Sequence, residues 1–296
     1  MATRADDPRS AGLRVESLSK TYANGVQALD GVSLTVQSGM HGLLGPNGAG
    51  KSTLMRTLAT LQRPDAGTFA LDGRSGLDDP DGLRRRLGYL PQQVGAYPGV
   101  SARSLLTRFA WLKGRTEKTL RTREVDALLD RVNLLADANR EVAGFSGGML
   151  RRFGIALALL GQPRLLIVDE PTAGLDPAER NRFHRVLADV AADAVVLLST
   201  HIVEDVENLC ERVSILAGGR IVAEGTPESL REKLRGRVWS RVVPRDEPLP
   251  ANPLHVVAAP GGERVFLVED AKPEGDYEGW DPRLEDVYHH ALSEAS

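Results

Sequence analysis

Two short segments of this chain have the residue types and spacing that nucleotide chemistry requires. The first is Gly45-Pro-Asn-Gly-Ala-Gly-Lys-Ser-Thr53, which matches the pattern G-x-x-x-x-G-K-S/T, follows an apolar strand and opens a helical pattern. Glycines let such a loop curl so that successive backbone N–H groups point inward, and the following helix adds its positive N-terminal end. We therefore expect a polyphosphate-binding loop formed by Gly45, Pro46, Asn47, Gly48, Ala49, Gly50, Lys51, Ser52 and Thr53.

Two side chains of this loop have specific expected roles. Lys51 would reach the β- and γ-phosphates as a point charge, and the Ser52 hydroxyl would supply a hard oxygen ligand for Mg²⁺. The pattern arises by chance about once in a hundred chains of this length. Its place between a strand and a helix makes coincidence rarer still.

The second segment, Leu165-Leu-Ile-Val-Asp-Glu170, is an apolar strand that ends in two carboxylates. Enzymes with a phosphate-binding loop hold Mg²⁺ at such a strand end, so Asp169 is the expected metal ligand. Glu170 is better placed to orient and polarise the water that attacks the γ-phosphate. A solvated pair of acids is the alternative, and the first motif disfavours it.

A third segment, Phe145-Ser-Gly-Gly-Met149, precedes the helical run Leu150–Leu160. A Ser-Gly-Gly sequence at a helix start offers free N–H groups and a hydroxyl to an anion, although a plain helix cap explains the local sequence equally well. One chain would then carry two phosphate sites. A second phosphate site is more than one bound nucleotide needs, which suggests that this site serves a nucleotide bound to another copy.

Short aliphatic runs alternate with helical patterns along the chain, which predicts an α/β fold. Strands are expected at Val32–Val36, His41–Leu44, Leu165–Val168, Val195–Leu198 and Val213–Leu216, and helices at Ser52–Leu61 and Ala178–Val190. Between Gly99 and Arg140 the strands disappear and apolar residues recur at helical spacing. We expect an inserted helical lobe over about residues 99–160.

The composition changes near Arg235, where prolines begin to interrupt strand-like pieces at Val238–Val243, His255–Ala258 and Val265–Val268. We therefore expect a main domain over residues 13–235 and a small α+β appendage over residues 236–296. Its last helix is expected to have Pro282 in the first turn and to bury Leu284, Val287 and Tyr288.

Charge and composition exclude several classes of protein. The net charge of −3 gives no basic field that would attract nucleic acid, so no nucleic-acid partner is expected. The one cysteine, Cys210, excludes an internal disulfide and is expected in the core. The polar start lacks the apolar run of a signal peptide, and no stretch approaches the roughly 18 apolar residues that cross a bilayer. We expect a cytoplasmic protein that reaches a membrane only through a partner.

Taken in order, these motifs resemble the nucleotide-binding subunit of an ATP-binding-cassette (ABC) transporter over about residues 13–235. The resemblance implies a RecA-like P-loop NTPase core with an antiparallel β subdomain, and it identifies Gly45–Thr53 as the Walker A loop that binds ATP. It implies that Tyr22 stacks on adenine, and that Gln92 in Tyr89-Leu-Pro-Gln92 touches Mg²⁺ and faces the membrane partner. Tyr22 alone is equally typical of packing, and Gln93 competes with Gln92.

The same resemblance identifies Ser146-Gly147-Gly148 as the signature, Asp169 as the Walker B aspartate and Glu170 as the catalytic glutamate. Asp176, in Gly174-Leu-Asp-Pro177, corresponds to the D-loop, and His201 to the switch histidine that contacts the γ-phosphate, although a lone histidine after a strand is often structural. In this family two cassettes close head to tail. A homodimer or a closely related second cassette is therefore expected, together with a separately encoded transmembrane permease that would hold the chain at the inner face of the membrane.

The signature departs from the family pattern, since Phe145 and Met149 replace its leucine and glutamine, and methionine cannot donate a hydrogen bond. Met149, Arg151-Arg152 and the closing Leu284-Glu-Asp-Val-Tyr288 look most like the ABC-2-type branch, whose members include exporters of drugs, lipids and polysaccharides.

Other cassette ATPases are the alternatives to a transporter subunit. A ribosomal ATPase would usually have two cassettes, and a DNA-repair cassette would have a long coiled-coil or zinc-bearing insertion. Neither feature is present in this sequence. A cassette that regulates a membrane or ribosomal partner without transport remains open.

Overall fold

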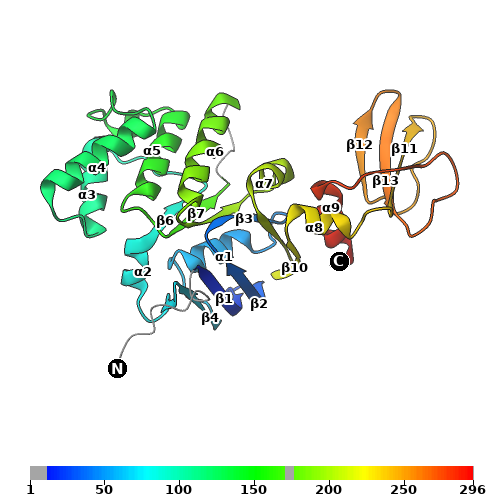
Figure 1. Ribbon diagram of the computed structural model, residues 1–296, viewed down its shortest axis with the longest axis horizontal. Helices are drawn as coiled ribbons and strands as arrows, with labels where there is room; N and C mark the ends of the chain where they lie inside the picture. Colours follow the sequence, from blue (N-terminus) through cyan, green and yellow to red (C-terminus); the bar gives the residue numbers. More distant parts are fainter. Residues whose placement is uncertain (1–11, 171–176, 296) are drawn as a thin grey trace.

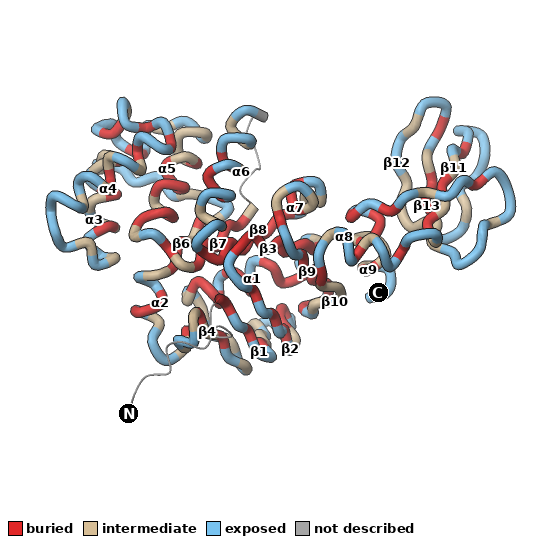
Figure 2. The backbone as a smooth tube through the Cα atoms, viewed as in Figure 1, coloured by how far each residue is buried: buried red, intermediate tan, exposed pale blue. Residues whose placement is uncertain are grey.

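A six-stranded sheet forms the centre of the structure, a computed structural model that describes residues 12–170 and 177–295. Its strands are β3 (Gly39–Leu44), β6 (Leu87–Leu90), β7 (Leu165–Asp169), β8 (Val195–Ser199), β9 (Arg212–Ala217) and β10 (Arg220–Gly225). They lie in the order β10-β9-β3-β8-β7-β6 (Figures 1 and 2). All neighbours are parallel except β10, which pairs antiparallel with β9. The sheet therefore brings the ends of strands distant in sequence to one edge.

Alternate residues of the central strands belong to two different hydrophobic cores. In β7, Leu165 and Ile167 pack with helix α1 (Lys51–Leu58), whereas Leu166 and Val168 pack with the helices on the other face. Every residue of β7 and β8 is buried, as expected for parallel strands covered on both faces (Figure 2).

A second, antiparallel sheet covers the outer side of α1. It consists of β1 (Leu13–Thr21), β2 (Gln27–Val36), β4 (Ala66–Leu71) and β5 (Arg74–Ser75), in the order β2-β1-β4-β5. Its buried side chains, among them Val15 and Phe69, share one core with Leu54 and Met55 of α1. Packing between two sheets therefore fixes α1, and with it the loop that precedes the helix.

Helices cover the other face of the central sheet and extend beyond it into a lobe (Figure 1). They are α3 (Ala102–Leu112), α4 (Lys118–Arg131), α5 (Gly147–Leu159) and α6 (Pro177–Ala191), with a short 3₁₀ turn at Val142–Gly144. Helix α2 (Pro80–Arg86) is on the α1 side, because its Leu83 belongs to the core that contains Leu54 and Met55. Leu106, Leu129 and Phe153 of the lobe are fully buried in the same core as Val168 of β7. The lobe is thus packed onto the sheet by apolar contacts.

The C-terminal part is a separate four-stranded sheet at the other end of the molecule (Figure 1). Its strands are β11 (Val238–Pro244), β12 (His255–Ala259), β13 (Gly262–Val268) and β14 (Glu278–Gly279). In the chain, α8 (Pro227–Glu232) precedes this sheet and α9 (Leu284–Glu294) follows it, whereas α7 (Val203–Leu209) connects β8 to β9 in the main domain. The last helix returns to the main domain, because Leu284, Val287 and Ala291 join a core with Val206 and Leu230.

A buried carboxylate joins α9 to this sheet. Asp286 is 1% exposed and accepts hydrogen bonds from His255 Nε2 at 2.6 Å, Trp280 Nε1 at 3.2 Å and the backbone N–H of Arg283 at 2.7 Å. The His255 ring also stacks on Phe266, with centroids 4.3 Å apart. These contacts tie β12, β13 and the segment before α9 into one unit.

The structure confirms the α/β fold class and each of the predicted strands, and it places Cys210 in the core. Two helix predictions were wrong in their bounds. The helix expected to reach Leu61 ends at Leu58, because Thr60 has a φ of 59° and breaks the helical path. Pro282 precedes the N-cap residue Arg283 rather than lying in the first turn of α9. No helix in the described residues is both long and apolar enough to span a bilayer.

A buried histidine in β3 generates the first prediction. His41 is 1% exposed, its Nε2 lies 2.9 Å from Ser214 Oγ, and burial, with the charge of Arg212, lowers its pKa to about 4. The unfolded chain takes up this proton near pH 6.5, so the free energy of unfolding should fall by about 3 kcal/mol as the pH drops from 6.5 to 4. His41→Gln should remove this part of the pH dependence, measured by urea unfolding at pH 7 and pH 4.

Near the end of α9, His290→Gln is the control and should keep the wild-type pH dependence, because the imidazole of His290 is only half-buried and pairs with the exposed Glu294. If His41→Gln lost as much stability as the wild type between the two pH values, the assignment of acid sensitivity to His41 would be wrong.

Candidate functional site

The predicted site residues follow strands that end at the same edge of the central sheet. Leu43 of β3 and Asp169 of β7 both lie opposite Ser199 of β8, and Leu90 of β6 lies opposite Val168. Since these strands are parallel, the segments that follow them leave the sheet side by side. The sheet therefore brings together four of the predicted segments, which begin at Gly45, Pro91, Glu170 and Thr200.

Glycine is required in the loop between β3 and α1. Gly50, immediately before α1, has a φ of 106°, and a Cβ there would lie 2.2 Å from the carbonyl oxygen of Ala28. Gly48 has a φ of 81°, yet a Cβ would meet nothing within 4 Å. The loop is thus packed against the protein at one glycine and open at the other, which leaves a face free for a ligand.

Two hydrogen bonds hold the Lys51 side chain against the backbone of this loop. It is 7% exposed, and its Nζ donates to the carbonyl oxygens of Gly45 at 2.5 Å and Pro46 at 3.0 Å. Burial lowers the pKa of Lys51, while the nearby carboxylates of Glu170 and Asp169 act in the opposite direction. A bound phosphate would compete with two carbonyls for this ammonium group. Ser52 is exposed in the first turn of α1.

Tyr22 is attached to the same helix start. Its hydroxyl lies 3.1 Å from Thr53 Oγ1 and donates to Gln62 Oε1 at 3.3 Å. The ring is half-buried, so one part remains accessible. Tyr22 therefore lies beside the phosphate-binding loop, where an aromatic face can take a planar base.

Asp169 fits the role of a Mg²⁺ ligand. It is 4% exposed, and its Oδ1 has no hydrogen-bond partner among the described residues. Burial raises the pKa of Asp169, and the charges of Arg56 and Lys51 oppose that shift. A buried carboxylate oxygen without a partner is costly, and a hard cation or its bound water would satisfy it. Ser52, Asp169 and Gln92 offer only oxygen donors, as Mg²⁺ prefers.

The backbone of Glu170 is strained. Its φ is 50°, a value uncommon for residues other than glycine. Its N–H donates to the carbonyl oxygen of Ser199 at 2.9 Å, and its Oε2 lies 2.7 Å from Nδ1 of His201. The side chain of Glu170 is 13% exposed and that of His201 57%. The structure thus brings two predicted residues into direct contact, in an arrangement that can hold a water molecule.

The structure positions the Gln92 segment through its backbone. The carbonyl oxygens of Pro91 and Gln92 both accept hydrogen bonds from Arg151 Nη1 at 2.9 Å, whereas the side chains of Gln92 and Gln93 are exposed. Arg151 also donates from Nη2 to the carbonyl oxygen of Glu170 at 2.8 Å. The sequence analysis missed Arg151 as a site residue, because the Arg-Arg pair after the Ser-Gly-Gly segment was its only signal.

The Ser-Gly-Gly segment lies at the start of α5. Ser146 caps the helix, with its Oγ accepting a hydrogen bond from the backbone N–H of Met149 at 3.3 Å. Ser146 and Gly147 are exposed, and no hydrogen bond joins this helix start to Gly45–Thr53 within the described residues. The two segments that are predicted to bind phosphate are therefore separate in one chain. Asp176 lies outside the described residues.

Comparison with known proteins gives a consistent result. The family model described as "ABC transporter" matches residues 29–173. The chain is 39% identical over 228 residues to the daunorubicin/doxorubicin resistance ATP-binding protein DrrA of Streptomyces peucetius, covering 76% of this chain and 68% of the relative. It is 37% identical over 255 residues to the Nod factor export ATP-binding protein I of Ralstonia nicotianae, covering 86% and 78%.

A solved structure supports the same relationship. A dimeric ATP-binding cassette in a post-hydrolysis state, bound to ADP and Pi, is 25% identical and aligns with a TM-score of 0.67, covering 72% of this chain and 98% of that one. Sequence and three-dimensional similarity therefore point to the same family of ATP-binding cassettes.

Proposed function

The chain belongs to the ABC transporter ATP-binding family, and from this premise we propose that two copies close around two ATP molecules to drive a separate membrane permease. The protein binds and hydrolyses ATP as an ABC transporter subunit. One observation carries the proposal for a shared site. The exposed helix start at Ser146 and the loop at Gly45–Thr53 do not meet in one chain, although each can bind phosphate. A second copy can complete each site.

The proposed roles follow the geometry at the sheet edge. The loop and Lys51 bind the phosphates, and Tyr22 takes the adenine ring. Glu170 orients and polarises the attacking water, and its contact with His201 at 2.7 Å fixes the direction of the carboxylate. Ser146 to Gly148 and Asp176 act on the nucleotide of the partner cassette. The backbone of Gln92 is held beside Glu170, so its side chain can sense both the metal and the permease.

Mg²⁺ is the proposed metal, held by Ser52 and Asp169 with Gln92 nearby. It would neutralise charge on the β- and γ-phosphates. The buried, unpartnered Oδ1 of Asp169 supports this assignment.

Export is the proposed direction of transport. The two relatives described above are named for drug resistance and for Nod factor export, which supports this direction. The cassette would sit at the cytoplasmic face of the membrane, attached through its permease. That permease, and not this chain, would contact the cargo.

The role of Glu170 is tested by Glu170→Gln, which keeps the shape of the side chain and removes its charge. The rate of ATP hydrolysis should fall by about 10²-fold or more. Because ATP still binds, the variant should form a dimer that depends on ATP and Mg²⁺ in size-exclusion chromatography. Glu263→Gln, at an exposed position of β13, is the control and should keep the wild-type rate. Unchanged hydrolysis in Glu170→Gln would remove Glu170 from the mechanism.

The shared site is tested by Ser146→Arg, which blocks the helix start with a bulky cation. Hydrolysis should fall by about 10²-fold, while the affinity of the monomer for ATP changes less than about twofold, because Ser146 serves the nucleotide of the partner. Thr122→Arg, at an exposed position of α4 in the same lobe, should behave as the wild type. Weaker ATP binding by the Ser146→Arg monomer would contradict the arrangement.

Mixing two inactive variants gives a sharper version of this test. Lys51→Ala has a defective loop and an intact helix start, and Ser146→Arg has the reverse. A mixed dimer contains one intact site, so the mixture should recover up to about a quarter of the wild-type rate if pairing is random. No recovery, with mixed dimers demonstrated by tagged copies, would count against a site built from two chains.

A further inference from the structure

One buried cation connects three segments of the site. Arg151 lies on α5, little more than one helical turn after Ser146, and is 8% exposed. Its Nη1 donates to the carbonyl oxygens of Pro91 and Gln92, both at 2.9 Å, and its Nη2 donates to that of Glu170 at 2.8 Å. The helix that begins with the signature is thereby bonded to the backbone of the Gln92 segment and to that of the hydrolytic glutamate.

The chemistry of the guanidinium suits this place. Burial lowers the pKa of Arg151 to about 10, and the charge of Asp169 opposes the shift, so the group is charged at neutral pH. Three carbonyl oxygens offset the cost of burying the charge. The planar fork of arginine presents donors in fixed directions to several acceptors, whereas the single ammonium of lysine cannot reproduce that geometry.

The strained backbone of Glu170 indicates what the hydrogen bond from Arg151 contributes. A non-glycine residue with a φ of 50° is strained and persists only where its surroundings hold it. Three contacts hold this residue: its N–H on Ser199, its carboxylate on His201 and its carbonyl oxygen on Arg151. Without Arg151 the carbonyl loses its partner, and the peptide can relax toward an ordinary conformation. The carboxylate would then turn away from its place at the sheet edge.

We propose that Arg151 is a positioning residue for hydrolysis, which fixes the Glu170 carboxylate and the Gln92 segment relative to the signature helix. This inference rests on the proposed role of Glu170. Movement of α5, when a partner's nucleotide docks on Ser146, is passed directly to the backbone of Glu170. Hydrolysis is thereby made to depend on a correctly seated signature helix.

The test is Arg151→Met, which keeps much of the side-chain volume and removes the donors. The kcat for ATP hydrolysis should fall by about 10- to 100-fold, and the affinity of the monomer for ATP should change less than about twofold. Arg151→Lys should give an intermediate kcat. If the methionine variant fails to fold, the kcat of Arg151→Lys tests the inference. Full activity in either variant would overturn the inference.

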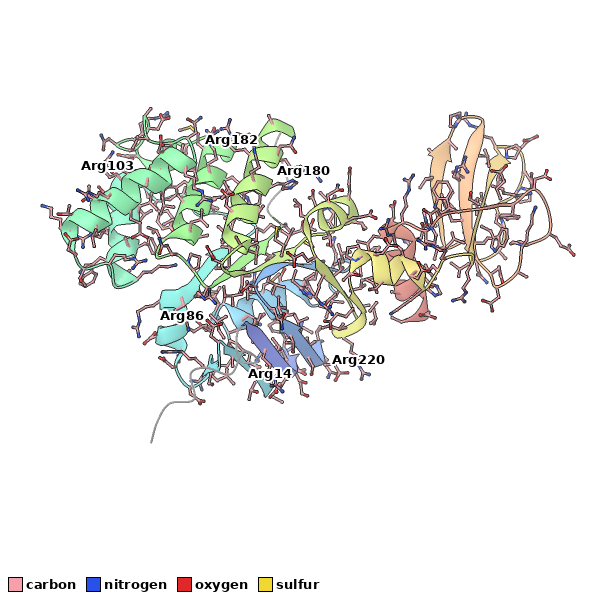
Figure 3. All side chains as sticks on the ribbon, viewed as in Figure 1. Arg14, Arg86, Arg103, Arg180, Arg182 and Arg220 are labelled. Atoms are coloured by element: carbon pink, nitrogen blue, oxygen red, sulfur yellow. The ribbon has the colours of Figure 1, made fainter. Side chains whose placement is uncertain are left out.

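The matched control is Arg103→Met on α3. Arg103 belongs to the same lobe but pairs with Asp126 of α4, away from the sheet edge (Figure 3). Its loss should leave kcat unchanged, while any loosening of the lobe should be visible as a lower melting temperature. An equal fall in kcat for Arg103→Met would show that general disturbance of the lobe, not positioning, explains the effect.

A double-mutant cycle separates positioning from a merely structural role. If Arg151 acts through the Glu170 carboxylate, Arg151→Met should add less than about a twofold loss to the residual hydrolysis of Glu170→Gln. An additive loss of 10-fold or more in that background would contradict the inference. The ATP-dependent dimer of Glu170→Gln should also survive the second substitution.

Different results would overturn the proposed role of Glu170 and the inference about Arg151. Wild-type hydrolysis by Glu170→Gln would remove the proposed role of Glu170, and the inference with it. Loss of hydrolysis in Glu170→Gln together with a wild-type kcat in Arg151→Met would overturn only the inference.

Discussion

Parallel pairing of β3, β8, β7 and β6 is the constraint on which the rest of the structure depends. It places Leu44, Ser199, Asp169 and Leu90 at one edge, although these residues span more than half of the chain. Each strand is buried on both faces, so its register is set by packing against two cores. The chemistry of the site is confined to the segments that leave this edge.

Few charged side chains lie at that edge, and they are buried, so packing fixes their positions. Lys51, Asp169 and Arg151 are each less than a tenth exposed. Lys51 and Arg151 are satisfied by backbone carbonyls, and Asp169 keeps one oxygen without a partner. The charges of Lys51 and Arg151 are bonded to neutral carbonyl groups, so they are not cancelled by these partners. The site can therefore still interact with the charge of a ligand. In the proposed dimer, the exposed Ser146 of a second copy completes the site.

The C-terminal sheet is connected to this machinery through α9. The helix packs on α7, which begins two residues after His201, and on α8. A cleft of about 940 Å³ between α7 and the segment before α9 is lined by both His201 and Trp280. Residues 236–295 therefore form a sheet of their own but no independent unit, since their last helix packs into the core of the main domain.

The sequence by itself determined the motifs and most of the elements. Two motifs could be interpreted from the sequence, Gly45–Thr53 and Leu165–Glu170. Their predicted roles depend on local backbone geometry and on strand ends, and both of these are determined by consecutive residues. The α/β class followed from alternation of strand and helix patterns for the same reason. The end of α1 at Leu58 and the start of α9 at Leu284 were missed, since they depend on the backbone conformations of Thr60 and of the N-cap residue Arg283.

Only the tertiary structure decided which distant residues meet. Arg151 touches Gln92 and Glu170 because α5 lies across the ends of β6 and β7, and Asp286 binds His255 because α9 returns to the C-terminal sheet. These contacts join residues from 19 to 59 positions apart and satisfy buried charges. No local pattern encodes them, because the cost of burying a charge and the groups that offset it arise only when the chain is packed.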